Sequence, residues 1–258
     1  MKAKKRLGQN FLKDETVIMK IANEIEATPE DLIIEIGPGR GALTKKLLTK
    51  NCKVLAYELD LDLKPVLINL NKEQLTVIFK DILKSNIKED IKDIKYKELY
   101  LVGNLPYYIT TPIIEHIISQ DLDFKKFTIM VQKEVADRFL AKPKSKNYGY
   151  MTLLLNYYFE LEKVCDVSKY AFVPVPKVES AVVSFRPREN KPEVDISKYK
   201  VFLKNVFRQK RKTLKNNIGG IYDWDKLKKV LAQRNILEQV RAEELSEDVL
   251  IDLFHATL

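Results

Sequence analysis

Cysteine and histidine are scarce in this chain, which has two of each among its 258 residues. Cys52 and Cys165 cannot build a disulfide framework and lack the CxxC spacing of a zinc site, so we expect two buried thiols in a reducing compartment. His116 and His255 are too few for a typical zinc enzyme. These shortages lead us to expect no metal cofactor.

Long apolar runs are also missing. No run reaches the roughly 18 apolar residues of a membrane-spanning helix. The basic residues 1–7 are not followed by the apolar core of a secretory signal. We therefore expect a cytoplasmic protein without membrane contacts.

The chain is instead rich in positive charge. It has 45 Lys and Arg residues against 36 Asp and Glu, which gives a net charge of +9. Such a balance favours a polyanionic partner, such as nucleic acid or an anionic membrane face. The hydrophobic fraction of 45% excludes a wholly disordered chain. At about 150 residues per domain, the length suits one large domain and a small one.

Strand-like and helical patterns alternate along the first two thirds of the chain. Helical spacing covers residues 14–27, 42–48, 60–70 (where Pro65 is a possible interruption), 112–118 and 134–140. Strands are expected at residues 32–36, 53–58, 75–79, 99–102, 127–131, 157–164 and 180–185. This alternation predicts an α/β fold with a Rossmann-like, doubly wound and mostly parallel sheet, whose ligands bind at the carboxyl ends of the strands.

A polar segment with two prolines, residues 186–192, separates this pattern from a purely helical one. Helical spacing then recurs at residues 199–207, 226–234 and 248–255. We therefore predict an α/β domain over residues 1–189 and a small all-helical domain over residues 190–258.

A glycine-rich turn, Gly37-Pro-Gly-Arg-Gly41, lies between an expected strand and an expected helix. Glycine allows positive φ and close approach of a ligand to the backbone. Glu58 ends the next strand, where a carboxylate can accept both hydroxyls of a ribose. Together they indicate an adenosine-type cofactor, although NAD enzymes share this pattern. A structural turn and a solvated strand-end charge are the alternatives.

Two further acidic residues lie near this edge. Glu35 interrupts an apolar strand, either to accept hydrogen bonds from the glycine turn or as a partly exposed carboxylate. Asp81 follows the third strand, either to accept an adenine amine or to cap a loop.

The turn Asn104-Leu-Pro-Tyr107 follows the fourth strand. An exocyclic adenine amine is a poor nucleophile because its lone pair is delocalised into the ring. The Asn104 side-chain oxygen and the Leu105 carbonyl can accept its hydrogens and restore the lone pair. Pro106 fixes the turn, and Tyr107 offers a face for a flipped base. An ordinary loop with a core tyrosine is the alternative.

At these residues the chain resembles the S-adenosylmethionine-dependent rRNA adenine N6-dimethyltransferases. The resemblance covers nearly the whole chain and includes four ordered motifs: Gly8-Gln-Asn-Phe-Leu12, residues 35–44, residues 104–110 and Phe172-Val-Pro-Val-Pro-Lys-Val178. It implies a class I methyltransferase fold and S-adenosylmethionine as methyl donor. Residues 144–149 and 172–183 look closer to the KsgA type than to the Erm type, which modifies large-subunit RNA.

The resemblance also implies residue roles. Asn10 and Leu12 would close over the cofactor, Gly37 would contact its amino-acid part, Glu58 its ribose and Asp81 its adenine. Asn104 would lie between cofactor and target base. Phe172 would be a second stacking face opposite Tyr107, although from the residues alone it is an ordinary core aromatic.

The implied substrate is a pair of adjacent adenosines in the 3′-terminal hairpin of small-subunit rRNA, each dimethylated at N6. The implied partner is a pre-assembled small ribosomal subunit. We expect the protein to bind it as a monomer. Lysine and arginine clusters are candidates for phosphate contacts, or else solvated charge runs: Lys4, Lys5, Arg6, Arg208, Lys210, Arg211, Lys212 and Lys215. Lys4 to Arg6 form the N-terminal basic cluster, and Arg208 to Lys215 form the second basic cluster, which also has helical spacing.

Three other functions compete with this interpretation. An Erm-type methylase would act on other RNA, and a non-catalytic ribosome assembly factor would keep only the fold. A nicotinamide oxidoreductase would need a proton donor near the sheet edge, which the sequence does not offer.

Overall fold

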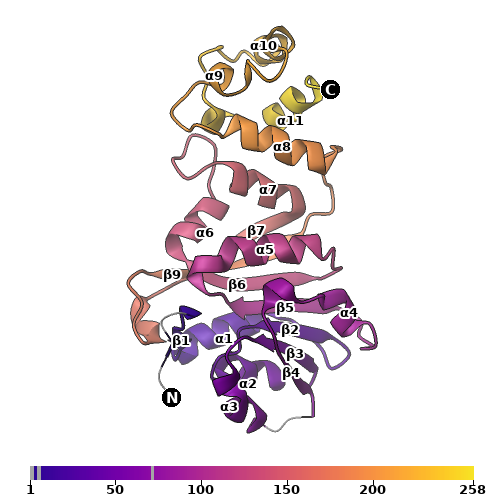
Figure 1. Ribbon diagram of the computed structural model, residues 1–258, viewed down its shortest axis with the longest axis vertical. Coiled ribbons are helices and arrows are strands. Elements are labelled where there is room, and N and C mark those ends of the chain that lie inside the picture. Colours follow the sequence, from indigo (N-terminus) through magenta and orange to yellow (C-terminus); the bar gives the residue numbers. More distant parts are fainter. Residues whose placement is uncertain (1–2, 5–6, 71–72) are drawn as a thin grey trace. The chain divides into compact units, whose positions relative to one another are not determined.

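The computed structural model describes residues 3–4, 7–70 and 73–258 (Figure 1). These residues form two compact units. The α/β unit comprises residues 1–136 and 162–187, and the helical unit comprises residues 137–161 and 188–258. This division differs from the predicted 1–189 and 190–258, because residues 137–161 group with the helical unit, where Tyr148 and Leu153 are part of the core.

Seven strands form the main sheet, in the order β4-β3-β2-β5-β6-β9-β7. The pairs from β4 to β6 are parallel, and β9 is antiparallel to β6. The predicted mostly parallel α/β sheet is therefore confirmed. The strands are β2 (Leu32–Ile36), β3 (Lys53–Glu58), β4 (Leu75–Phe79), β5 (Leu99–Asn104), β6 (Lys126–Gln132), β7 (Phe159–Val167) and β9 (Ser180–Pro187). A separate antiparallel pair joins β1 (Phe11–Leu12) to β8 (Phe172–Val173).

Helices cover both faces of the sheet, since all five residues of β2 are buried. Asp14 caps the first helix by accepting a hydrogen bond from the Val17 N–H. Pro65 lies in the first turn of α3, where its missing N–H costs nothing. The helices of this part are α1 (Glu15–Glu24), α2 (Ala42–Leu48), α3 (Lys64–Ile68), α4 (Ile87–Ile91) and α5 (Thr110–Ser119), and α6 (Lys133–Phe139) runs from this unit into the helical unit.

The helical unit has its own core, built around the fully buried Phe202, Leu231 and Leu250. Its helices are α7 (Tyr150–Tyr158), α8 (Ile196–Val206), α9 (Leu214–Ile218), α10 (Trp224–Gln233) and α11 (Glu247–His255). The strand predicted from residue 157 begins at Phe159, because Tyr157 and Tyr158 still belong to α7.

The strand register brings the important loops to one edge of the sheet. Ile36 lies opposite both Tyr57 and Gly103, so the glycine turn, Glu58 and Asn104 all follow neighbouring strand ends. Glu58 in turn lies opposite Phe79, which places Asp81 at the same edge. Within the described residues, no helix is both long and apolar enough to cross a membrane.

Candidate active site

One pocket at this edge is lined by most of the residues predicted to be catalytic or cofactor-binding. Its walls come from residues 7–12, the glycine turn, the ends of β3 and β4, and the turn after β5. The predicted site residues that line it are Asn10, Leu12, Gly37, Glu58, Asp81, Asn104, Leu105, Pro106 and Tyr107. The pocket therefore lies where parallel α/β sheets bind their ligands.

The glycine turn depends on backbone conformations that other residues rarely adopt. Gly37 and Gly39 have φ of +72° and +57°. A Cβ on Gly39 would lie 3.1 Å from the ring of Phe11, and one on Gly37 would point at the Asn104 carbonyl, 3.6 Å away. The missing side chains at Gly37 and Gly39 therefore let the glycine turn lie close to the turn after β5 and to the N-terminal segment. The N-terminal segment is the described part of the chain up to the end of β1, residues 3–4 and 7–12.

Glu58 is buried, with 6% of its surface exposed. Its Oε2 accepts a hydrogen bond from the Gly39 N–H at 3.0 Å, and its Oε1 accepts one from the Asp60 N–H at 2.8 Å. Burial raises the pKa of Glu58, and these two backbone donors act against the rise. Because each carboxylate oxygen can accept more than one hydrogen bond, both retain capacity for a ligand hydroxyl.

Asp81 caps a loop, as one of its two predicted roles required, and the adenine contact stays a prediction. Its Oδ1 caps the short 3₁₀ turn Ile82–Lys84 by accepting from the Leu83 N–H at 3.0 Å. The same residue lines the pocket beside Ile82. The second oxygen of Asp81 can therefore accept from a ligand while the first caps the loop.

Glu35 meets neither expectation. Its side chain is only 1% exposed, and among the described residues its Oε2 has no hydrogen-bond partner. Burial raises the pKa of Glu35 to about 7, the Thr44 hydroxyl acts against this, and the Glu58 carboxylate adds to it. Glu35 lines the pocket next to the glycine turn, so its Oε2 can accept a hydrogen bond from a ligand that binds there.

The Asn104 amide is oriented by the N-terminal segment. Its Nδ2 donates to the Asn10 carbonyl at 3.1 Å. A carbonyl can only accept, so this bond directs the nitrogen toward Asn10. Neither the Asn104 Oδ1 nor the Leu105 carbonyl accepts a hydrogen bond from the described part of the chain. The two predicted acceptors thus retain their capacity.

Tyr107 is fixed at its hydroxyl, which lies 2.5 Å from the Ser180 Oγ. The Pro106 carbonyl accepts from the Ile109 N–H at 3.2 Å and from the Thr110 hydroxyl at 3.3 Å, which closes the turn. These contacts hold the Tyr107 ring in the pocket wall.

Phe172 requires a correction. It was expected as a stacking face opposite Tyr107, but it is fully buried and belongs to the core next to α1 and α2. The antiparallel pairing with β1 sets Phe172 opposite Leu12. Since side chains alternate along a strand, Phe172 faces the core and its neighbour Val173 is 45% exposed.

The N-terminal basic cluster is also corrected in part. Lys4 Nζ lies 2.5 Å from both Asp60 Oδ1 and Asp62 Oδ2, so two carboxylates balance its charge. A phosphate contact would have to compete with them. Lys5 and Arg6 lie outside the described residues.

The second basic cluster is exposed but is not one helical face. Residues 208–212 form turns between α8 and α9. Asn217 holds the start of these turns: its side chain is buried, and its Nδ2 donates to the carbonyls of Val206 and Gln209 at 3.0 and 3.1 Å. The exposed basic residues of the cluster are Arg208, Lys210, Arg211, Lys212 and Lys215.

Sequence reasoning missed Asp60, a buried carboxylate that contacts both Lys4 and Gln9. An acidic residue two positions after Glu58 was the available signal. In the described residues, no group of three His, Cys, Asp or Glu side chains could hold a metal ion.

Comparison with known proteins identifies the family of the chain. Residues 1–257 match the family model of the ribosomal RNA adenine dimethylases. A protein of Lactobacillus johnsonii named ribosomal RNA small subunit methyltransferase A is 43% identical and aligns with 99% of this chain and 90% of its own length. A protein of the same name from Mycoplasma mobile is 41% identical, with 98% and 97% covered.

Two solved structures share the fold over both units. A dimethyladenosine transferase from Plasmodium falciparum superposes with a TM-score of 0.77 at 26% identity, covering 94% of this chain and 95% of its own. The 23S rRNA methyltransferase ErmE gives a TM-score of 0.75 at 25% identity, covering 96% and 99%. With the family model and these relatives in agreement, the chain is an enzyme that belongs to the ribosomal RNA adenine dimethylase family.

Proposed function

We propose that this enzyme transfers methyl groups from S-adenosylmethionine to N6 of two adjacent adenosines in the 3′-terminal hairpin of small-subunit rRNA. The products are N6,N6-dimethyladenosines. The observation that carries the proposal is the single pocket that Glu58, Asp81 and the Asn104–Tyr107 turn share. The proposal includes a monomer that acts in the cytoplasm on a pre-assembled small subunit.

The pocket residues fit S-adenosylmethionine. Glu58 offers a buried carboxylate for the ribose hydroxyls, and Asp81 beside Ile82 offers an acceptor and an apolar surface for the adenine. Gly37 leaves space for the amino-acid part, and the orphaned Glu35 oxygen lies behind it. When bound, the sulfonium supplies an activated methyl group, so no metal is needed to activate the donor.

The turn after β5 would hold the target adenine. The Asn104 Oδ1 and the Leu105 carbonyl accept the hydrogens of N6, which localises its lone pair for in-line attack. The Tyr107 ring, fixed through Ser180, stacks on the flipped base. An uncharged amide also tolerates a monomethylated amine and accepts its remaining hydrogen, which allows a second transfer.

Large-subunit RNA is the second candidate substrate, since ErmE shares the fold. The small subunit is favoured because relatives named for it reach 41–43% identity over nearly the whole chain, against 25% for ErmE. The test supplies labelled S-adenosylmethionine with under-methylated small or large subunits. We expect N6,N6-dimethyladenosine in small-subunit rRNA only. Label in the large subunit would favour the second candidate, and binding without label would favour an assembly factor.

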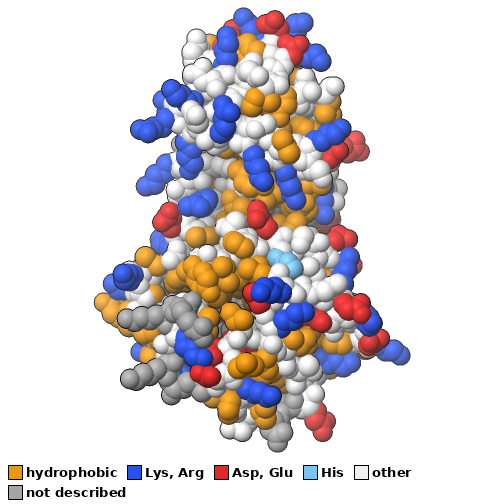
Figure 2. Space-filling view, in the orientation of Figure 1, with side chains coloured by type: hydrophobic (Ala, Val, Ile, Leu, Met, Phe, Trp, Pro, Cys, Tyr) orange, Lys and Arg blue, Asp and Glu red, His pale blue; other side chains and the backbone are white. Residues whose placement is uncertain are grey.

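The exposed basic loops of the helical unit support RNA binding. Lys210 Nζ donates to the Lys146 carbonyl at 3.3 Å, which brings residues 208–212 beside the basic loop 142–146. Figure 2 shows several Lys and Arg side chains close together over the part of the molecule labelled α7 to α9 in Figure 1. No ion pair joins Arg211 or Lys212 to another described residue. Two loops from different parts of the sequence therefore form one positive surface suited to phosphates.

Reversing charge on this surface should weaken RNA binding. Arg211→Glu with Lys212→Glu is expected to lower affinity for small-subunit rRNA and to reduce the salt slope by about two. Affinity is measured by filter binding across a series of salt concentrations. The control is Lys226→Glu with Lys229→Glu, an equal charge change on exposed residues of α10. An unchanged salt slope in the first variant would remove this surface from the proposal.

A further inference from the structure

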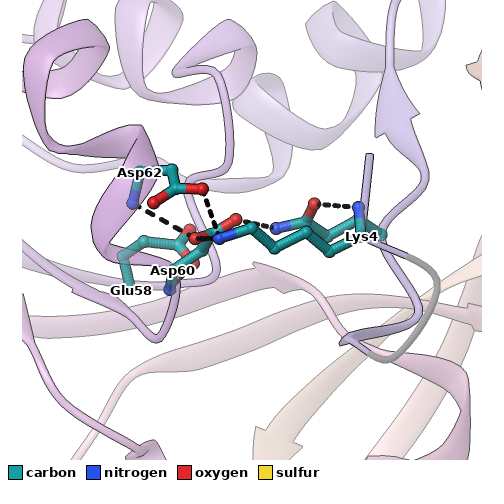
Figure 3. Close-up of polar contacts among 5 residues, drawn as sticks. Lys4, Glu58, Asp60 and Asp62 are labelled. Carbon is teal, nitrogen blue, oxygen red and sulfur yellow. Dashed lines mark hydrogen bonds and ion pairs between the residues drawn. The ribbon is translucent and has the colours of Figure 1, made fainter. Parts of the chain in front are cut away.

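The N-terminal wall of the pocket is held by a buried carboxylate that does not line the pocket itself. Asp60 follows β3 and is 4% exposed. Its Oδ1 lies 2.5 Å from Lys4 Nζ, and its Oδ2 accepts from Gln9 Nε2 at 2.7 Å (Figure 3). The backbone N–H of Lys4 donates to Gln9 Oε1 at 2.8 Å, so the two residues bind Asp60 as a pair.

Asp60 is also tied to the cofactor side of the pocket. Its own backbone N–H donates to Glu58 Oε1, and its Oδ1 accepts from the Asp62 N–H at 3.1 Å. Burial acts to raise the pKa of Asp60, but the hydrogen bonds from Lys4 and Gln9 hold it below its usual value. A charged carboxylate therefore connects the N-terminal segment to the proposed ribose site.

The segment has two other attachments to the pocket. Asn10 accepts from Asn104, and the Arg40 guanidinium lies over the Phe11 ring, 4.4 Å from its centroid. All four of these residues line the pocket. The contact with Asp60 lies at the start of the segment and uses polar bonds alone, which can break and reform without disturbing the core.

We propose that Asp60, together with Lys4 and Gln9, is a positioning group that latches the N-terminal segment over the cofactor and controls how fast the cofactor leaves. This inference rests on the proposed function, in which each transfer leaves a spent donor that must be exchanged. Lys4 keeps 27% of its side chain exposed, so water reaches the latch. The latch therefore holds the segment closed during a transfer and opens between transfers.

The same geometry indicates which part of the molecule the charge of Lys4 serves. Asp60 and Asp62 flank its ammonium group, which places this residue in the latch rather than in the RNA-binding surface.

The test measures release of S-adenosylhomocysteine from the full chain by stopped-flow competition, without RNA. Lys4→Met and Gln9→Ala should each speed release by roughly tenfold, the size expected for a lost hydrogen bond to a charged group. Asp60→Asn keeps the acceptor for the Asp62 N–H and should have a similar effect. Lys4→Met should add little to Asp60→Asn, because the single change at Asp60 already removes the charge that Lys4 binds.

Lys13→Met is the matched control, since it removes a nearby exposed lysine that has no side-chain partner among the described residues. Its release rate should equal that of the unmodified chain. Hydrogen exchange of residues 7–12 gives a second readout without any ligand, and Lys4→Met should accelerate it.

Release within twofold of the unmodified chain in both Lys4→Met and Gln9→Ala would overturn the latch. Unchanged exchange of residues 7–12 would overturn it as well. If the unmodified chain binds no S-adenosylhomocysteine, the proposed function fails, and the proposed control of cofactor release fails with it. Accelerated exchange in Lys4→Met would then show that the attachment itself exists, which separates the two failures.

Discussion

Asn104→Ala is expected to slow methyl transfer to small subunits by about 1000-fold. The side chain donates through Nδ2 to the Asn10 carbonyl, which leaves Oδ1 as an acceptor at the pocket. Alanine removes that acceptor, so the N6 lone pair stays delocalised and the methyl group has no good nucleophile. The rate is measured with labelled S-adenosylmethionine under single-turnover conditions.

Folding and cofactor binding are measured on the same variant. The melting temperature should change little, because Asn104 is partly exposed and makes one side-chain hydrogen bond. The dissociation constant for S-adenosylmethionine should rise by only a few fold. Transfer within tenfold of the unmodified enzyme would refute the role of Asn104, whatever the binding results.

Glu58→Gln is expected to weaken S-adenosylmethionine binding by about 100-fold. The two carboxylate oxygens accept from the N–H groups of Gly39 and Asp60. Glutamine has one oxygen and one NH₂ group, so one backbone N–H would face another donor. The charged acceptor for the ribose is lost at the same time. The free energy of unfolding should also fall, by about 1–3 kcal/mol.

Calorimetry measures the first effect and urea unfolding the second. Glu115→Gln, on the exposed side of α5, is the matched control and should change neither quantity. A dissociation constant within threefold of the unmodified value for Glu58→Gln would exclude Glu58 from the ribose site.

The sequence predicts much of the site because its signals are local. Gly37 and Glu58 sit at strand ends, and parallel strands bring their carboxyl ends to one edge without further information. The turn from Asn104 to Tyr107 follows the same rule. The part of the pocket that follows the strand ends could therefore be predicted from the alternation of strands and helices, whereas its N-terminal wall could not.

Contacts between distant segments could not be predicted in this way. In the sequence Lys4 is one of several basic residues near the N-terminus. Only the fold shows that it contacts Asp60, which lies 56 positions further along the chain. Phe172 was expected from the resemblance to stack on a base, yet it is fully buried in the core, where β8 pairs with β1. Residues 208–212 have helical spacing of their charges but form turns, where Asn217 binds the carbonyls of Val206 and Gln209, a contact that the sequence does not mark.

The central claim is that one pocket binds the methyl donor and presents it to the turn at Asn104. A crystal structure with S-adenosylmethionine tests this most directly. We predict the ribose hydroxyls at Glu58, the adenine amine at Asp81 and the sulfonium methyl directed toward Asn104. A donor bound away from these three residues would contradict the account.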